Sequence, residues 1–140
     1  MSITPDIWGK HLWFSIHIIA LAYPMKPTYV DIENYKLFFT HLQHVIPCYK
    51  CAENYKKHLE ILPIALDDNE KLFEWTVKMH NLVNKMNGKD EWSLEKAKKF
   101  YLNFGKNTKK HTPQSNNNNY LIFIAIFAII IAVCFFARRR

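Results

Sequence analysis

Apolar residues recur at three-and-four spacing through most of the first hundred residues, and this spacing restricts the fold more than any other feature. It is typical of helices that bury one face. Glycine occurs only 3 times in 140 residues, which also favours helices with short turns over a sheet. We therefore expect an all-α fold, a four-helix bundle with a short fifth helix.

Local signals predict where the first three helices begin and end. Thr4-Pro5-Asp6 is typical of a helix start, and Tyr23-Pro24 would end that helix. A second helix is expected from about Asp31 to His44, because Pro47 prevents its continuation. The third would begin at or just after Cys48.

Two further helices are expected. Asp67-Asp68-Asn69-Glu70 opens the fourth in the manner of a capping box, and Gly88 would close it in a left-handed conformation. Ser93 would cap the last helix, and Gly105 is its expected end.

The composition changes after residue 106, which indicates four parts. Residues 1–106 are the helical domain, and residues 107–119 form a polar linker that ends in four asparagines. Residues 120–137 carry no charge and would span about 27 Å as a helix, close to the hydrocarbon thickness of a bilayer. Arg138, Arg139 and Arg140 form a basic tail. A C-terminal transmembrane helix is therefore expected.

The first ten residues lack a basic stretch followed by an apolar run, so we expect no signal peptide. A single terminal span without a leader predicts a tail anchor, with the domain in the cytosol. The lysines before the span compete with the arginines after it for the cytosolic side.

The formal charge of +7 does not indicate nucleic-acid binding. Three of the 19 basic residues form the tail, and no arginine precedes Arg138 to make bidentate phosphate or base contacts. The other lysines are spread along the chain among 12 acidic residues. We expect no nucleic-acid partner.

Cys48 and Cys51 form a Cys-x-x-Cys pair that comes directly after Pro47. Such a pair can close a redox disulfide, share a metal or simply pack. Structural zinc needs four ligands, and no second pair and no His-x3-5-His lies downstream of the cysteines. The third cysteine, Cys134, falls in the apolar span, so a dense disulfide scaffold is excluded. Redox chemistry is favoured by the helix amides behind the pair, because they would stabilise a thiolate. A zinc module and a helical adaptor with an incidental pair remain as alternatives.

Four separated motifs resemble the FAD-linked sulfhydryl oxidases of the Erv/ALR family. They are Trp8-Gly9-Lys10-x-x-Trp13-x-x-x-His17, Tyr23-Pro24, Pro47-Cys48-x-x-Cys51 and His80-Asn81-x-Val83-Asn84, the last followed by Lys89. The resemblance covers roughly residues 7–104 in the family's order. The small size and Trp92-Ser93 look most like the members encoded by large DNA viruses.

The resemblance implies a helical bundle that binds FAD noncovalently. Cys51 would be the sulfur beside the flavin ring, in charge-transfer contact as a thiolate, and Cys48 the sulfur that substrate thiols attack. The residues implied to line the cofactor are Gly9, Lys10, Trp13, His17, His80, Asn81, Val83, Asn84, Lys89 and Trp92. Aromatic rings and histidines stack on flat rings, asparagines bond polar edges, and lysines meet a pyrophosphate.

The resemblance also implies the reaction and the partners. A protein dithiol would be oxidised to a disulfide, and its electrons would pass through FAD to O2 to give H2O2. Larger relatives carry a second, shuttle Cys-x-x-Cys, which this sequence lacks, so the pair would meet its substrate directly, for example a thioredoxin-like carrier. A homodimer is expected. A viral enzyme of this kind would act on host cytoplasmic membranes or in the virion.

Overall fold

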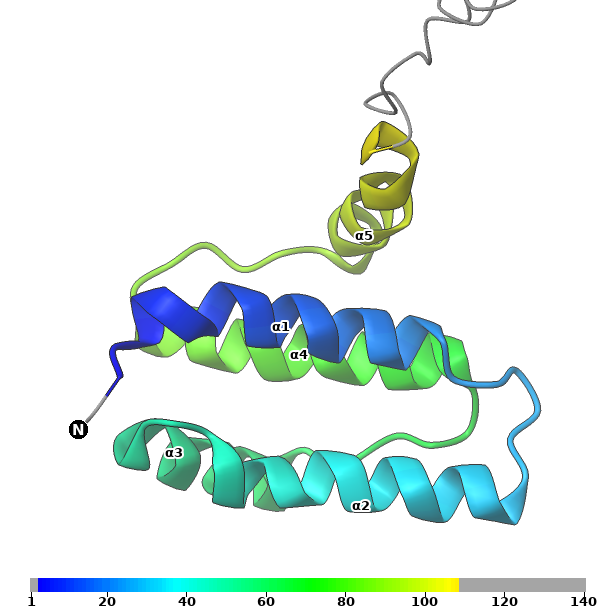
Figure 1. The fold of residues 1–140 in the computed structure, drawn as a ribbon, viewed down its shortest axis with the longest axis horizontal. Helices are drawn as coiled ribbons and strands as arrows, with labels where there is room; N and C mark the ends of the chain where they lie inside the picture. Colours follow the sequence, from blue (N-terminus) through cyan, green and yellow to red (C-terminus); the bar gives the residue numbers. More distant parts are fainter. Residues whose placement is uncertain (1–2, 109–140) are drawn as a thin grey trace, which may run out of the picture. The chain divides into compact units, whose positions relative to one another are not determined.

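The computed structural model describes residues 3–108, which form five helices (Figure 1). They are α1 (Pro5–Leu21), α2 (Tyr29–Val45), α3 (Tyr49–Ile61), α4 (Asn69–Met86) and α5 (Leu94–Thr108). The prediction of an all-helical domain is confirmed. The predicted polar linker, apart from its first two residues, the transmembrane helix and the basic tail lie outside the described residues. Within residues 3–108, no helix combines the length and the apolar character that a membrane crossing requires.

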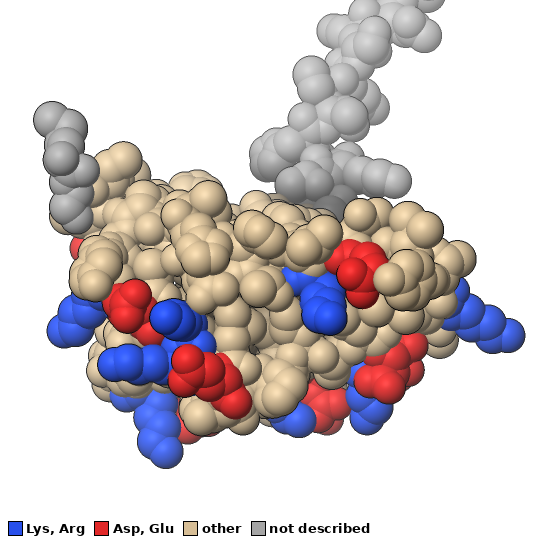
Figure 2. Space-filling model, turned by 90° about the horizontal axis from the view of Figure 1, so that it is seen from below, with Lys and Arg blue, Asp and Glu red and all other residues tan. Residues whose placement is uncertain are grey.

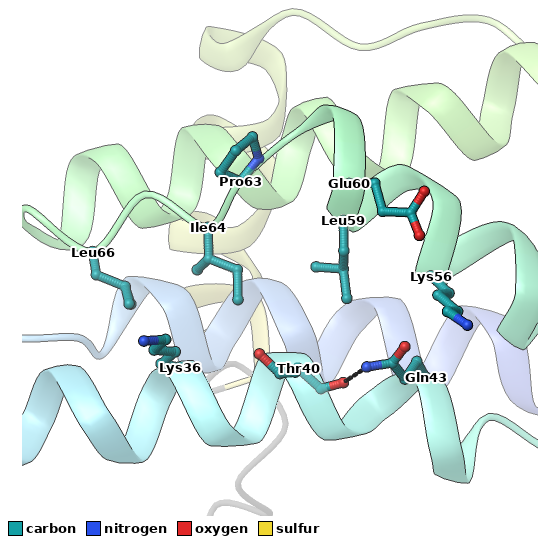
Figure 3. Close-up of a pocket in the computed structure, with 9 residues that line it drawn as sticks. All are labelled: Lys36, Thr40, Gln43, Lys56, Leu59, Glu60, Pro63, Ile64 and Leu66. Carbon is teal, nitrogen blue, oxygen red and sulfur yellow. Dashed lines mark hydrogen bonds between the residues drawn. The ribbon is translucent and has the colours of Figure 1, made fainter.

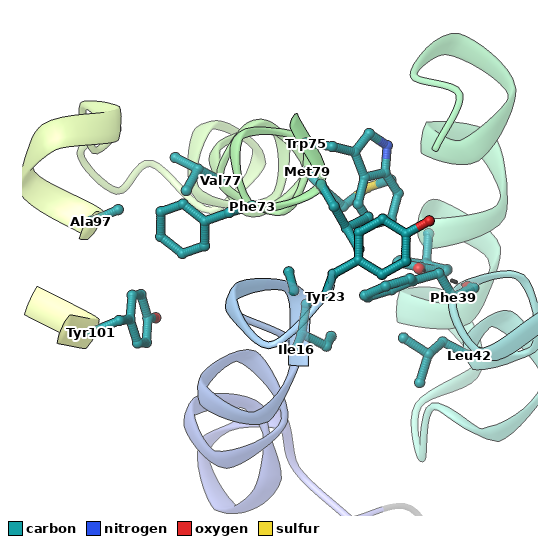
Figure 4. Packing of buried hydrophobic residues seen from close by; sticks show 13 residues of the cluster. Ile16, Tyr23, Phe39, Leu42, Phe73, Trp75, Val77, Met79, Ala97 and Tyr101 are labelled. Atoms are coloured by element: carbon teal, nitrogen blue, oxygen red, sulfur yellow. Dashed lines mark hydrogen bonds between the residues drawn. The ribbon is translucent and has the colours of Figure 1, made fainter. Parts of the chain in front are cut away.

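The helices up to Gly105 pack as one compact unit in which α1 lies against α4 and α2 lies against α3. Aromatic and aliphatic side chains from all five helices form a shared core (Figure 4). Phe39 of α2 meets Trp75 of α4 edge-on with ring centroids 5.1 Å apart. Tyr55 of α3 donates a buried hydrogen bond to the carbonyl of Phe39 (2.8 Å). The core therefore ties the α2–α3 pair to α4.

The capping box lies at α2 rather than at α4, where the sequence predicted it. Thr28 caps α2, and its side chain accepts from the N–H of Asp31 while Asp31 accepts from the backbone N–H of Thr28. α2 therefore begins two residues before the expected Asp31. At α4, Asp68 caps the N–H of Lys71 (2.8 Å). A capping box needs an acceptor at that third position, and lysine has none, so the prediction of a box there was wrong.

The fifth helix is not short, which corrects the prediction. It runs for 15 residues, two more than α3, and continues through Gly105 to Thr108. A glycine inside a helix costs only about 1 kcal/mol relative to alanine, which does not by itself end the helix. Gly88 does adopt the predicted left-handed conformation, with φ of 64°, directly after Asn87, the C-cap residue of α4.

Charged side chains of both signs are interspersed on the face seen in Figure 2. Lysines and acidic residues lie beside one another at its sides, along its lower edge and within the face, and uncharged side chains fill much of the rest. Opposite charges that neighbour one another largely cancel beyond a Debye length, so this face carries no strong field of one sign.

Candidate redox and cofactor site

Cys48 and Cys51 are joined by a disulfide at the start of α3. Cys48 is the N-cap residue of this helix, and its sulfur accepts a hydrogen bond from the N–H of Cys51 (3.2 Å). Pro47 cannot continue α2, so the chain turns here and begins α3 directly after Cys48. Both cysteines are partly exposed, and Tyr49 between them is 83% exposed. The disulfide can therefore be approached from solvent.

The start of α3, the start of α1 and the end of α4 lie at the same end of the unit (Figure 1). This arrangement results from the connections, because α1 and α4 are antiparallel neighbours, and α3 runs back along α2. The predicted residues Gly9 and Lys10 lie near the start of α1, while Asn84 and Lys89 lie at the end of α4 and just beyond it. Two of the predicted motifs are thus brought to the end that carries the disulfide.

Trp13 and His17 of α1 and His80 of α4 form one cluster between the two helices. The rings of Trp13 and His80 lie parallel, with centroids 4.1 Å apart and an interplanar angle of 2°. His17 is 1% exposed and its Nε2 lies 3.0 Å from Nδ1 of His80. Trp13 and His17 are four residues apart and share one face of α1, but the closer partner of Trp13 is His80.

Both histidines of this cluster are held neutral. Burial, followed by the effect of neighbouring His80, lowers the pKa of His17 to about 3. Burial, followed by the positive charge of Lys89, lowers the pKa of His80 to about 4. At neutral pH each ring therefore carries a single proton and has one nitrogen free to accept a hydrogen bond.

Asn81 holds the segment that leads to α5. Its side-chain amide donates to the carbonyl of Trp92 (2.8 Å) and its oxygen accepts from the N–H of Trp92 (2.9 Å). The ring of Trp92 lies under the ammonium group of Lys96, 4.6 Å from the ring centroid. The amide of Asn81 thus bonds the backbone of Trp92, and its role in lining a cofactor stays a prediction of the family resemblance.

The other predicted positions are partly or largely exposed. Val83 and Asn84 are partly exposed, Lys10 and Lys89 are exposed, and the N–H of Lys89 bonds the carbonyl of Asn84 (2.9 Å). A Cβ added at Gly9 would meet nothing within 4 Å. Neither the helical backbone nor packing among the described residues requires glycine there, so the open space beside Gly9 is available to a bound group.

Thr76 was not among the predicted site residues, yet its side chain contacts the cluster. It is fully buried, and its hydroxyl lies 2.9 Å from Nδ1 of His17 and 2.7 Å from the carbonyl of Phe73. In the sequence, Thr76 lies in a stripe of apolar residues that recur at helical spacing in α4, with Leu72 and Trp75 before it and Met79 after it. A hydroxyl four residues before His80 on that stripe was the available signal.

A separate pocket of about 430 Å³ lies between α2, α3 and the segment after α3 (Figure 3). Lys36 and Thr40 line it from α2, and Leu59 and Ile64 from the other side. None of the predicted site residues lines this pocket. Among residues 3–108, no three His, Cys, Asp or Glu side chains converge as a metal site would require.

Comparisons with known proteins agree on one family. The model of the Erv1/Alr family matches residues 10–103. The chain is 40% identical over 90 residues to a probable FAD-linked sulfhydryl oxidase of Acanthamoeba polyphaga mimivirus, covering 62% of this chain and 63% of that protein. It is 32% identical over 95 residues to the FAD-linked sulfhydryl oxidase ERV1 of Arabidopsis thaliana, covering 68% of this chain and 50% of that protein. The match thus spans between half and two thirds of each relative's length.

The fold is also similar to a solved structure. The crystal structure of the FAD binding domain of Erv1 from Saccharomyces cerevisiae matches with a TM-score of 0.68 and 26% identity. This match covers 71% of the present chain and 94% of the yeast domain. The helical core described above is therefore similar to a complete FAD-binding domain.

Proposed function

This chain belongs to the Erv1/Alr family, and from that premise we propose that it is an FAD-linked sulfhydryl oxidase that forms disulfides in other proteins. The observation that carries the proposal is the partly exposed Cys48–Cys51 disulfide at the start of α3. A disulfide in this position can exchange with the thiols of a substrate.

The residues present fit FAD as the cofactor. Trp13 and His80 offer parallel flat rings, Lys10 and Lys89 offer positive charge for phosphates, and the helix face at Gly9 is open. His17 and His80, held neutral, add no positive charge of their own to this cluster. FAD, when bound, supplies an acceptor for two electrons and passes them to O2, which is reduced to H2O2.

We assign the two cysteines different tasks. A substrate thiolate attacks the sulfur of Cys48, the Cys48–Cys51 bond breaks, and Cys51 leaves as a thiolate. A second substrate thiolate then attacks the substrate sulfur of the mixed disulfide, and Cys48 leaves with the bonding electron pair. The N–H of Cys51, which bonds the sulfur of Cys48, stabilises that leaving thiolate. The substrate is oxidised by two electrons and the cysteine pair is reduced by two.

The substrate class is set by this exchange. It is a protein dithiol able to reach the start of α3, for example on a thioredoxin-like carrier. Tyr49 and Lys50 are exposed between the cysteines and would be the first side chains such a partner meets.

The purified chain is expected to be yellow, with an absorbance band at about 450 nm, and to consume oxygen when a dithiol is added. Cys51→Ser is expected to abolish turnover and to retain the flavin, because the Cys48–Cys51 disulfide that substrate thiols must attack cannot form. Cys48→Ser is expected to abolish turnover for the same reason. Cys134→Ser is the matched control and should leave turnover unchanged. A colourless protein that binds zinc would overturn the proposal.

We also propose a homodimer and a membrane anchor. Exposed apolar side chains on α1 and α2, among them Ile7, Ile18 and Leu37, support pairing with a second copy, which sedimentation of the purified protein would measure.

The uncharged residues 120–137 support an anchor that leaves the domain in the cytosol, on host cytoplasmic membranes or in a virion. Protection of the domain from protease in sealed vesicles would contradict the cytosolic orientation.

A further inference from the structure

A chain of hydrogen bonds runs from the backbone of α4 through α1 and back to α4. It connects the carbonyl of Phe73, the hydroxyl of Thr76, both ring nitrogens of His17, and Nδ1 of His80, with contacts of 2.7, 2.9 and 3.0 Å. Thr76 is fully buried and His17 nearly so, so water does not compete for these bonds.

The carbonyl of Phe73 sets the donor and acceptor of every hydrogen bond in this series. A carbonyl can only accept, so the single hydroxyl proton of Thr76 is donated to Phe73. The oxygen of Thr76 must then accept from His17, which places the proton of His17 on Nδ1.

The same reasoning extends to His80. Neutral His17 has one proton, so its Nε2 is an acceptor, and Nδ1 of His80 must donate to it. Neutral His80 then has a bare Nε2. This nitrogen has no hydrogen-bond partner among residues 3–108 and is not fully buried. The ring is also fixed in orientation, because it lies parallel to Trp13.

We propose that Thr76 is a positioning residue that fixes both histidines as Nδ1–H tautomers, so that Nε2 of His80 presents a hydrogen-bond acceptor to the bound cofactor. This proposal rests on the proposed function only in naming FAD as the occupant. The group of FAD that meets His80 is then a hydrogen-bond donor, a hydroxyl or an amine.

The proton positions can be measured directly in the full-length protein, with and without FAD, by two-bond ¹H–¹⁵N correlation spectra of the histidine rings. Signals of His17 and His80 are assigned by their loss in His17→Gln and His80→Gln. Both rings of the unaltered protein are expected to be protonated at Nδ1. A proton on Nε2 of His17 overturns the proposal, and this result needs no variant of Thr76.

Thr76→Val removes the hydroxyl with little change of shape, and Thr76→Ser retains it. In Thr76→Val the two tautomers of His17 each leave one buried nitrogen without a partner, so the fraction with Nδ1–H is expected to fall to about half or below. The tautomer of His80 should change together with that of His17. FAD should then bind about tenfold more weakly, which corresponds to the loss of one hydrogen bond. Thr76→Ser should keep the original tautomers and the original FAD affinity.

The outcomes separate this proposal from the proposed function. Unchanged tautomers in Thr76→Val, or the same tautomer loss in Thr76→Ser, would show that Thr76 does not set the proton positions. Failure of the unaltered chain to bind FAD would instead contradict the proposed function and leave the tautomer result standing. A general packing defect would lower the melting temperature of Thr76→Val without moving the ring protons.

Discussion

His17 is a titratable group that the fold keeps uncharged. It is 1% exposed and contacts Thr76, His80 and the rings of Phe73 and Tyr101. Burial raises the pKa of Tyr101 to about 12, so this neighbour offers no negative charge that would stabilise a protonated His17. Protonation of His17 is therefore coupled to unfolding.

The unfolding free energy is expected to decrease as the pH falls from about 6.5 toward 4. The pKa of His17 is 6.5 in the unfolded chain and about 3 in the folded one, so in this range the unfolded chain binds the additional proton. The stabilisation from neutral His17 is fully present above its pKa in the unfolded chain. Each histidine of this kind gives the unfolding free energy a slope against pH of up to about 1.4 kcal/mol per pH unit. Urea unfolding at several pH values measures it.

His17→Gln should reduce this slope, whereas His11→Gln, at an exposed position, should not. Asp31 and Glu74 have pKa values below their ordinary values of 3.8 and 4.5. Their contributions to the unfolding free energy are therefore lost only at pH values below these ordinary pKa values. An equal slope in His17→Gln and the unaltered chain would refute the role given to His17.

The resemblance of the sequence to the Erv/ALR family placed Trp13, His17 and His80 at one site but did not identify Thr76. Aromatic and histidine side chains are informative wherever they occur, because few other residues stack on flat rings. A threonine on an apolar stripe is ambiguous, since its methyl group packs and its hydroxyl can return to the backbone of its own helix. Only the packing of α1 on α4 shows that the Thr76 oxygen also reaches His17.

At the scale of helices, side chains cap the starts of α2, α3 and α4, and these caps differ in how many backbone N–H groups they satisfy. Thr28 and Asp31 satisfy each other's backbone N–H groups at α2, while Asp68 at α4 and Cys48 at α3 each satisfy one. The α2 start is thus the best satisfied of the three.

Thr28→Ala is expected to lower the unfolding free energy by about 0.5–2 kcal/mol, because the N–H of Asp31 loses its acceptor. Thr28→Ser retains the oxygen and should cost much less. Chemical denaturation at neutral pH measures both. If the two variants were equally destabilised, the lost methyl contacts rather than the cap would explain the effect.

Helix starts were predicted more accurately than the details of their caps or ends. Pro5 and Pro47 impose backbone limits that no packing overrides, so the boundaries beside them were correct. The capping box was misplaced because Asp67-Asp68-Asn69-Glu70 offers several acidic candidates, and only the register of the first turn decides which one is the cap. Gly105 weakens a helix without ending it, so it was a poor end signal.

At the scale of the whole molecule, the FAD-binding fold is contained in the described part of the chain. The family model matches residues 10–103, and the matching yeast FAD binding domain is covered over 94% of its length. We therefore expect residues 1–108 to fold without the remainder of the chain.

A chain of residues 1–108 is expected to retain the flavin absorbance and the dithiol oxidation rate of the full chain within about twofold. The reason is that the disulfide, the aromatic cluster and the Asn81–Trp92 bonds all lie within it. Only the full chain should sediment with membranes. Loss of flavin from the shortened chain at equal folded content would contradict this separation.

The hydrogen bonds between α1 and α4 also limit how the two helices can slide. Apolar side chains tolerate several alignments of neighbouring helices with similar burial, because dispersion and hydrophobic contacts have no direction. Nε2 of His17 and Nδ1 of His80 meet at 3.0 Å in the observed alignment, and a shift by one turn of about 5.4 Å would leave the buried nitrogen of His17 without this partner. The contact between His17 and His80 thus selects a single register for α1 against α4.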